Sequence, residues 1–500
     1  MTSIKPSKPR YAKVGEVYCV LSDKYHKWCA YQIVAEAEKS VAIIPLDWHS
    51  DRKPQPEDLT HLRQLPLEAF SWSGLAEPFY VGGFVVPGDY EYVGIAPVPS
   101  IEKIVTYSSW PSWFHQADFK YRWTTYPESE RLRYKAAKSA TQKVFVNGTE
   151  LTADTWRVFE NITSALTNWE ELDKLGQLTE INCSGPRPGL LDYIGTRQLI
   201  GTLSWLRHQQ NCIDLRGTRL HSVSVQIDTL ETLYLNDELE ELILCGERNA
   251  SLPLQIIHSP QGKNLTLQCK GTLANYELPL LSSLSLWQVK SLDFSLISQF
   301  YSNISALRVM GAPGIATNMH ALANLKQLAS LSINNIFGYS PQEFPGRETL
   351  PKLDWLQMSS LPAEAAKAIR KNFKGICALY IAQARKPDWL EANLDNPFRD
   401  WDGREHIALC HAKAAADAYR KVCRELKTLT KETENRLEVI ERIFSDFVAV
   451  FNKIEAKSAA IETIEREEVY EVFASLVNKL ALSEEQRNYY FDCFDRWRDF

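Results

Sequence analysis

A short apolar phrase recurs through the middle of the chain: an apolar residue, two others, a second apolar residue, one other, and a third apolar residue. The copies are Leu239-Leu242-Leu244, Gly262-Leu265-Leu267 with its first apolar position lost, Leu281-Leu284-Leu286, Ile304-Leu307-Val309, Leu328-Leu331-Ile333, Leu353-Leu356-Met358 and Ile376-Leu379-Ile381. They begin at residues 239, 262, 281, 304, 328, 353 and 376, so the steps run from 19 to 25 residues. Such a period, with one short strand per coil, is typical of leucine-rich repeats, whose apolar positions point inward. One coil cannot bury its apolar face alone, so we predict a leucine-rich-repeat solenoid over residues 177–385.

The apolar groups lie closer together before the regular copies begin. Leu178-Ile181-Cys183 is expected to form the first coil. Between Asn211 and Leu244 the apolar pairs are only about ten residues apart, which leaves no room for a helix in each coil. This part is therefore either a tightly wound β-solenoid or a set of hairpins, and the pattern does not choose between them.

The N-terminal hundred residues show the shorter period of strands. Apolar and β-branched residues predict strands near 14–21, 28–36, 41–46, 79–86 and 90–96, and Pro87-Gly88-Asp89 provides a turn before the last of them. Short strands joined by tight turns over this length predict a small SH3-like β-barrel within residues 1–105.

Residues 106–176 are expected to link the head to the repeats. Eight aromatic residues lie between Thr106 and Tyr126, with lysines and arginines among and after them: Tyr107, Trp110, Trp113, Phe114, Phe119, Tyr121, Trp123 and Tyr126. Such a stretch can bind single-stranded nucleic acid, but Glu128 and Glu130 interrupt the positive run, and no RNA-binding signature accompanies it. We favour the alternative that these rings pack the head against the repeats.

Helical spacing from Thr152 to Leu175 predicts a helix that caps the solenoid.

The C-terminal hundred residues, 400–500, predict a helical bundle. Helices are expected near 404–430, 432–457, 462–481 and 484–498, with Ser483 as the N-cap of the last. From residue 404 onward 16 Lys/Arg stand against 19 Asp/Glu, which indicates a solvated bundle rather than a basic arm. The predicted fold is therefore α+β, with three modules in the order barrel, solenoid, bundle.

Composition narrows the function classes. The chain of 500 residues has a formal net charge of −6, which argues against a protein built to hold nucleic acid or anionic membrane. No apolar stretch is long enough to span a bilayer, and Met1 to Arg10 lacks the apolar region of a signal peptide. Ten cysteines without a CxxC pair indicate reduced thiols. We expect a cytoplasmic protein that is a monomer when free.

The sequence contains no recognisable catalytic constellation. A Walker loop, a nucleophile elbow, an HExxH motif and a kinase signature are all missing. His406 and His411 are five residues apart and do not share a helix face, so a metal site there is disfavoured. We therefore expect no enzyme, no catalytic residue, no cofactor and no metal.

The outward positions of the repeats are the best candidates for function. Most are small or polar, but several belong to the residue types enriched at protein interfaces. The predicted partner-binding residues are Trp287, Arg308, Met310, Asn334, Trp355, Gln357 and Tyr380. The alternative is that another part of the chain covers these rings.

A resemblance to a known family implies a protein partner for this surface. Lys13-Val14-Gly15-Glu16-Val17-Tyr18, followed by a strand, a polar turn and Tyr31-Gln32-Ile33-Val34, resembles the start of a bacterial immunity-protein family. The layout of β-rich head, leucine-rich middle and helical tail is also similar to large immunity proteins encoded beside Rhs-type toxins. The resemblance implies a protein that occludes a cognate toxin in a 1:1 complex, the toxin being an ADP-ribosyltransferase acting on a translation factor. The alternatives are a repeat scaffold for another protein and a hydrolase that reverses a toxin's modification.

Overall fold

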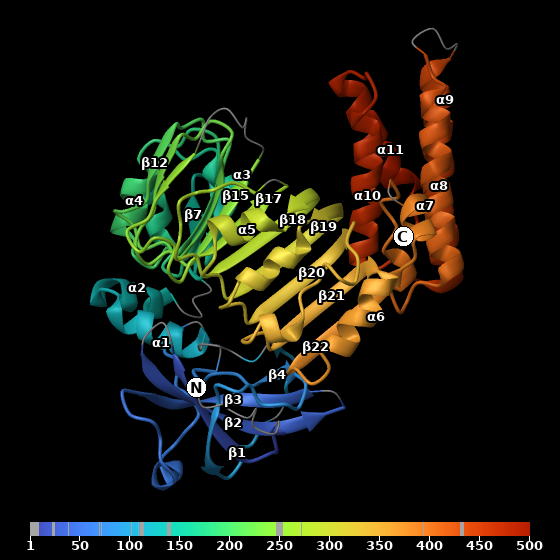
Figure 1. Cartoon of the computed structure of the whole chain (residues 1–500). Coiled ribbons are helices and arrows are strands. Elements are labelled where there is room, and N and C mark those ends of the chain that lie inside the picture. The colour runs from blue at the N-terminus through green and yellow to red at the C-terminus, as the bar shows by residue number, and fades with distance from the viewer. Residues whose placement is uncertain are drawn as a thin grey trace. The chain divides into compact units, whose positions relative to one another are not determined.

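A computed structural model describes residues 10–500, except for residues 23–25, 39, 70, 72, 102, 109, 111–114, 138–141, 247–253, 272, 394 and 431–434. Trp113 and Phe114 of the aromatic stretch lie outside the described residues. The fold is mixed α/β with several sheets and a helical C-terminal region (Figure 1). The chain divides into two compact units, Met1–Ala382 and Gln383–Phe500. The first unit contains the predicted head, the linker and the repeats up to Ala382, and the second begins at Gln383 and contains the predicted tail.

The N-terminal region forms a six-stranded sheet in the order β5-β1-β2-β3-β4-β6. The strands are β1 (Glu16–Ser22), β2 (Lys27–Ala37), β3 (Ser40–Ser50), β4 (Phe79–Gly82), β5 (Glu91–Ile95) and β6 (Tyr107–Ser108). Both faces are apolar: Val17 and Cys19 belong to one buried cluster, and Tyr18 and Val20 to another. The predicted β-rich head is confirmed, with strands close to the expected positions.

Two helices that the sequence pattern did not indicate follow the head. They are α1 (His115–Thr125) and α2 (Glu128–Ala137). Trp123, Tyr126 and Tyr134 on these helices form a buried cluster with Ala69 of the head and Leu199 of the repeats. Buried Arg197 also binds Glu130 of α2 through its Nε, 3.4 Å from the carboxylate. The helices therefore pack the head against the repeats, as expected for this stretch.

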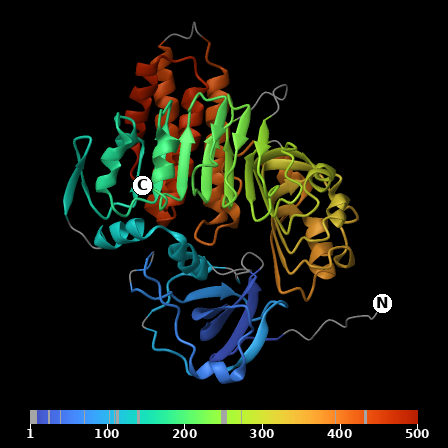
Figure 2. The same ribbon diagram turned by 90° about the vertical axis from the view of Figure 1, so that its left-hand side faces the viewer.

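Most strands of the repeats lie in one sheet of eleven strands. In spatial order the strands are β22 (Ala378–Arg385), β21 (Trp355–Pro362), β20 (Ser330–Phe337), β19 (Ala306–Thr317), β18 (Ser283–Asp293), β17 (Thr266–Lys270), β15 (Glu241–Cys245), β13 (Ser222–Gln226), β11 (Thr202–Leu206), β10 (Glu180–Ser184) and β9 (Arg157–Val158). Figure 2 shows the strands in the middle of the chain, drawn in green, side by side. The described pairings from β9 to β21 are all parallel, and Leu284, Leu307 and Leu331 are direct neighbours along the ladder.

The central apolar cluster explains why the strands stack. Leu284, Leu331 and their neighbours of the repeated phrase are almost completely buried, and α5 (Phe294–Phe300) and α6 (Ala363–Asn372) add Phe294 and Ile369 to the same cluster. Each such side chain contributes about 1.5–3 kcal/mol of transfer free energy when it is fully buried. Figure 1 shows α5 and α6 running beside β18 to β22.

The strands of residues 211–257 exclude one of the two arrangements that the sequence left open, a β-solenoid or a set of hairpins. These strands alternate between the large sheet and a second sheet of three strands, in the order β12-β14-β16. These are β12 (Cys212–Asp214), β14 (Thr232–Tyr234) and β16 (Gln255–Ile257), and both pairings are parallel. A hairpin would pair sequence neighbours in antiparallel fashion, so the hairpin interpretation is wrong.

The predicted helix over residues 152–175 is also wrong. The segment instead contains the end of β8 (Thr149–Thr152), which pairs with β7 (Lys143–Val146), then β9, α3 (Glu160–Thr163) and the 3-10 helix η2 (Trp169–Lys174). The carbonyl of Trp156 accepts the N–H groups of Thr179 and Glu180, and the strand that follows pairs with β10. Pairing in the sheet has overridden the local helical spacing.

Many strands of the large sheet contain, or are directly followed by, a residue with left-handed backbone. This residue comes directly after the first five residues of the strand: Gly185, Arg207, Gly246, Gln288, Asn335 and Ser360 all have φ between 49° and 87°. A left-handed residue turns the chain sharply, so these strands bend or end at this position. Asparagine and glycine adopt this conformation readily, but arginine, glutamine and serine do so at a cost.

The second unit contains the predicted helices of the tail. Its helices are α7 (Pro387–Asn393), α8 (Leu409–Lys427), α9 (Arg436–Ser458), α10 (Thr463–Asn478) and α11 (Glu484–Trp497), with the 3-10 helix η5 (Trp401–Gly403). Phe444, Phe447 and Phe451 of α9 are buried in one cluster with Phe473 and Phe494. The Ser483 side chain caps α11 by accepting the N–H of Gln486, as the sequence predicted. Within the described part of the chain, no helix is long and apolar enough to cross a bilayer.

Candidate partner-binding face of the parallel sheet

The seven predicted binding residues lie on strands β18 to β22, at positions that alternate with buried ones. On β20, for example, Leu331 and Ile333 are buried while Ser332 and Asn334 are half-buried on the other side. Trp287 and Tyr380 are the large exposed side chains of this face, with 43% and 59% of their surface accessible. Arg308 is exposed, whereas Met310, Asn334, Trp355 and Gln357 are half-buried. Strand periodicity therefore places all seven on one face.

The register of the strands arranges these residues in rows. Arg308 is opposite Ser285 on one side and Ser332 on the other, and Ser332 is in turn opposite Gln357. Met310 is opposite Asn334. Neighbouring strands are roughly 4.8 Å apart, so Arg308 and Gln357, two strands apart, are separated by about 10 Å along their row.

Trp355 occupies a different row. It is opposite Ser330, and it precedes Gln357 by two residues on the same strand and the same face. The structure thus brings the seven side chains onto one ribbon, but only Trp287 and Arg308 are in direct ring contact.

Trp287 is held in place by its own strand. Its indole Nε1 donates a hydrogen bond of 2.8 Å to Ser285 Oγ, and Ser285 is 6% exposed. On the next strand the guanidinium carbon of Arg308 is 5.9 Å from the centroid of a Trp287 ring. A fixed ring with an exposed face is a suitable anchor for a partner, because little side-chain freedom is lost on binding.

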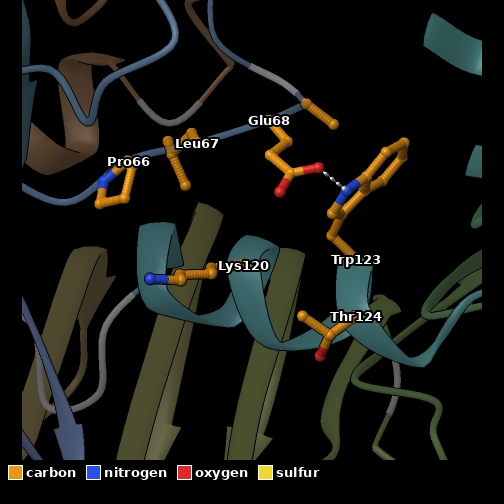
Figure 3. A pocket seen from close by; sticks show the side chains of 7 residues that line it. Pro66, Leu67, Glu68, Lys120, Trp123 and Thr124 are labelled. Atoms are coloured by element: carbon orange, nitrogen blue, oxygen red, sulfur yellow. Dashed lines mark hydrogen bonds between the residues drawn. The ribbon is translucent and has the colours of Figure 1, made fainter.

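A small cavity that no sequence pattern predicted lies between the head and α1 (Figure 3). It has a volume of about 160 Å³ and is lined by Pro66, Leu67, Glu68, Ala69, Lys120, Trp123 and Thr124. Small-molecule sites usually measure roughly 300–1,000 Å³. The cavity is therefore better explained as imperfect packing between head and helix than as a ligand site.

Glu68 connects the walls of that cavity. Its Oε2 accepts hydrogen bonds from Lys135 Nζ at 2.5 Å and from the indole of Trp123 at 3.2 Å. The bond from Lys135, followed by the one from Trp123, lowers the pKa of the Glu68 carboxyl. Trp123 is buried and so are Tyr126 and Tyr134, so these rings are not available to stack on nucleic-acid bases.

His406, Glu462 and Glu465 in the second unit could geometrically surround a metal ion. The buried Glu465 is already engaged: Oε1 is bonded by Arg404 and lies 3.2 Å from His406 Nε2, and Oε2 accepts the backbone N–H of Glu462. Burial acts to raise the pKa of Glu465, but the bonds from Arg404 and the backbone outweigh it, and the net shift is downward. A guanidinium at this position would repel a cation, so the group is better explained as a structural ion cluster.

Comparison with known proteins does not assign the chain to a family. No protein-family model matches the chain, and no curated protein sequence matches it significantly. The candidate site therefore rests on the sequence and the structure of this chain alone.

Proposed function

We propose that this chain is a binding protein, and that the outward face of β18 to β22 is its docking surface for another protein. The observation that carries the proposal is the placement of Trp287, Arg308, Trp355 and Tyr380 on one face, although each comes from a different repeat. Tryptophan, tyrosine and arginine are the residue types that dominate interface energetics.

The finer description of the architecture belongs to the same proposal. The parallel ladder with one buried apolar phrase per strand supports a leucine-rich-repeat solenoid in residues 177–385. For the head, an SH3-like barrel would be formed by closing the six-stranded sheet, whose outermost strands are β5 and β6. A sheet held together by a continuous ladder of parallel strands would present the docking face with little backbone movement on binding.

In its most specific form, the proposal is that the chain is an immunity protein that acts in the cytoplasm. The support is the resemblance of residues 13–34 to an immunity-protein family, which implies a cognate Rhs-type toxin with ADP-ribosyltransferase activity on a translation factor. The protein would cover the toxin's active site or substrate surface in a 1:1 complex, without catalysis, cofactor or metal. A general repeat scaffold would use the same face for another protein, whereas a hydrolase would need a nucleophile or a metal site in addition.

A titration of toxin activity distinguishes these functions. The toxin domain encoded directly upstream would be held at fixed concentration while this protein is added in steps. Occlusion predicts residual activity that falls in proportion to added protein and reaches zero at equimolar amounts. A trace of protein that clears all activity would favour the hydrolase, and unaffected activity at tenfold excess would favour the scaffold.

A further inference from the structure

The outward face of the large sheet changes its charge character along the repeats. In the first part it carries carboxylates that already have partners on the same face: Glu180 is paired with Arg157 at 2.7 Å, and Glu241 accepts hydrogen bonds from the uncharged side chains of Ser222 and Gln268. Within the first five residues of each strand from β17 to β22, the outward positions (first, third and fifth) include no aspartate or glutamate. The charged residues at these positions are Lys270 and Arg308, and both are positive.

These two cations come from the two strands that flank the strand of Trp287. Lys270 on β17 is the register neighbour of Trp287 on β18, and Arg308 on β19 has its guanidinium over the ring of Trp287. All three side chains are exposed. Among the residues that the structure describes, no carboxylate lies within 4.0 Å of the charged group of Lys270 or Arg308.

The chain itself offers a comparison for this arrangement. Arg157 also lies over a tryptophan, with its guanidinium carbon 4.4 Å from a ring of Trp156, but Arg157 has Glu180 as its carboxylate partner. The group of Lys270, Trp287 and Arg308 also has a guanidinium over a tryptophan ring, but among the described residues no carboxylate is paired with it. A partner that supplies a carboxylate would complete it, and the ring would shield that ion pair from water.

We propose that Lys270, Trp287 and Arg308 form a recognition site for an acidic peptide segment of the partner protein, with one or two carboxylates bound between the two cations. This deepens the proposed function and rests on it. The half-buried amides of Asn334 and Gln357, further along the ribbon, can hydrogen-bond the backbone of the same segment. Nucleic acid is disfavoured as the occupant because two cations on a chain of net charge −6 are too few to follow a phosphate backbone.

The test observes Trp287 directly. The full-length protein is labelled with 5-fluorotryptophan, and the fluorine resonances of Trp287, Trp355 and Trp156 are assigned from the variants Trp287→Phe, Trp355→Phe and Trp156→Phe. Hexaglutamate, hexalysine and a six-residue oligothymidylate are then titrated separately at low ionic strength. Hexaglutamate should shift the Trp287 resonance, and added salt should weaken the effect because the site is exposed. Trp156 is the internal control and should not move, since its arginine is already paired.

The variant Lys270→Gln/Arg308→Gln should lower the affinity for hexaglutamate about tenfold. Its matched control is Arg157→Gln, which should leave the Trp287 response unchanged. No Trp287 shift with hexaglutamate, an equal shift with hexalysine, or a stronger shift with the oligothymidylate would each overturn the proposal.

Failure of the proposed function can be recognised separately. A hexaglutamate response at Trp287 together with an unprotected toxin would overturn the immunity function and leave acidic recognition standing. If the Lys270→Gln/Arg308→Gln variant still neutralises the toxin and binds it with unchanged affinity, acidic recognition would be overturned and the immunity function would stand.

Discussion

Arg308 and Trp287 come from consecutive repeats, yet the guanidinium carbon of Arg308 lies 5.9 Å from the centroid of a Trp287 ring. The contact exists because β18 and β19 pair in parallel, with Ser285 directly opposite Arg308. The Trp287 indole is in turn hydrogen-bonded to that same Ser285. Register, and not proximity in sequence, therefore creates the most distinctive feature of the candidate binding face.

Truncating the binding face should weaken partner binding. Trp355→Ala and Arg308→Ala are each expected to cost about 2 kcal/mol of binding free energy, roughly thirtyfold in affinity for the cognate toxin. Calorimetric titration of toxin into each variant measures the loss. Ser204→Ala, at an outward position of β11 and outside the docking face, is the control and should bind normally. Unchanged affinity in both variants, with an unchanged melting temperature, would falsify the docking face and direct attention to the β-rich head.

Two glutamine-to-glycine substitutions should have opposite effects on stability. Gln288 is exposed with φ of 53°, a conformation that costs a side-chain-bearing residue about 1 kcal/mol, so Gln288→Gly should raise the free energy of unfolding. Gln357 lies inside β21 without a positive φ, so Gln357→Gly should lower it by about 0.5–1 kcal/mol. Chemical denaturation measures the change in the free energy of unfolding for each variant. Two changes of the same sign would contradict the conclusion that the backbone of Gln288 is strained.

The ion cluster of the second unit should make stability depend on pH. The folded protein lowers the pKa of Glu465 from its ordinary value near 4.5, so its stabilising contribution is complete above about pH 4.5. That contribution is lost as pH falls through the lower pKa of the folded state. Glu465→Gln should therefore destabilise by about 2 kcal/mol at pH 7 and progressively less at acidic pH.

The matched control for this prediction is Glu467→Gln, which lies on the same helix α10 and is exposed. Its effect on the free energy of unfolding should be small, because exposed charges contribute little to stability. Thermal unfolding of wild type and both variants between pH 7 and pH 3 provides the comparison. A Glu465→Gln penalty that stays the same down to pH 3 would exclude ionisation of Glu465 as its cause.

The cysteines should be free thiols with two reactivity classes. Ten cysteines are free in the structure, of which Cys212 and Cys410 are exposed. Burial raises the pKa of the Cys19, Cys29, Cys183 and Cys269 thiols to about 12, which suppresses the reactive thiolate. Titration of the unreduced native protein should thus label Cys212 and Cys410 first. Under denaturing conditions ten thiols should react, and a markedly lower number would contradict a reducing compartment.

Sequence periodicity by itself determined the parts of the fold that depend on local burial. Leu353, Leu356 and Met358 predicted both the position of β21 and the face that it buries, because alternate residues of a strand point to opposite sides. The phenylalanines of α9 predicted a tail helix in the same way, through helical spacing. The outward positions of Trp287, Arg308 and Tyr380 followed from the same alternation.

Only the tertiary structure decided which distant residues meet. The helical spacing of residues 152–175 did not produce the expected helix, because the carbonyl of Trp156 is engaged by the N–H groups of Thr179 and Glu180. Helices α1 and α2 form around rings that are buried against the head and the repeats, which no local pattern encodes. Lys270, Trp287 and Arg308 come together only through the register of β17, β18 and β19. Local periodicity specifies a face, whereas hydrogen bonding between strands specifies the neighbours on it.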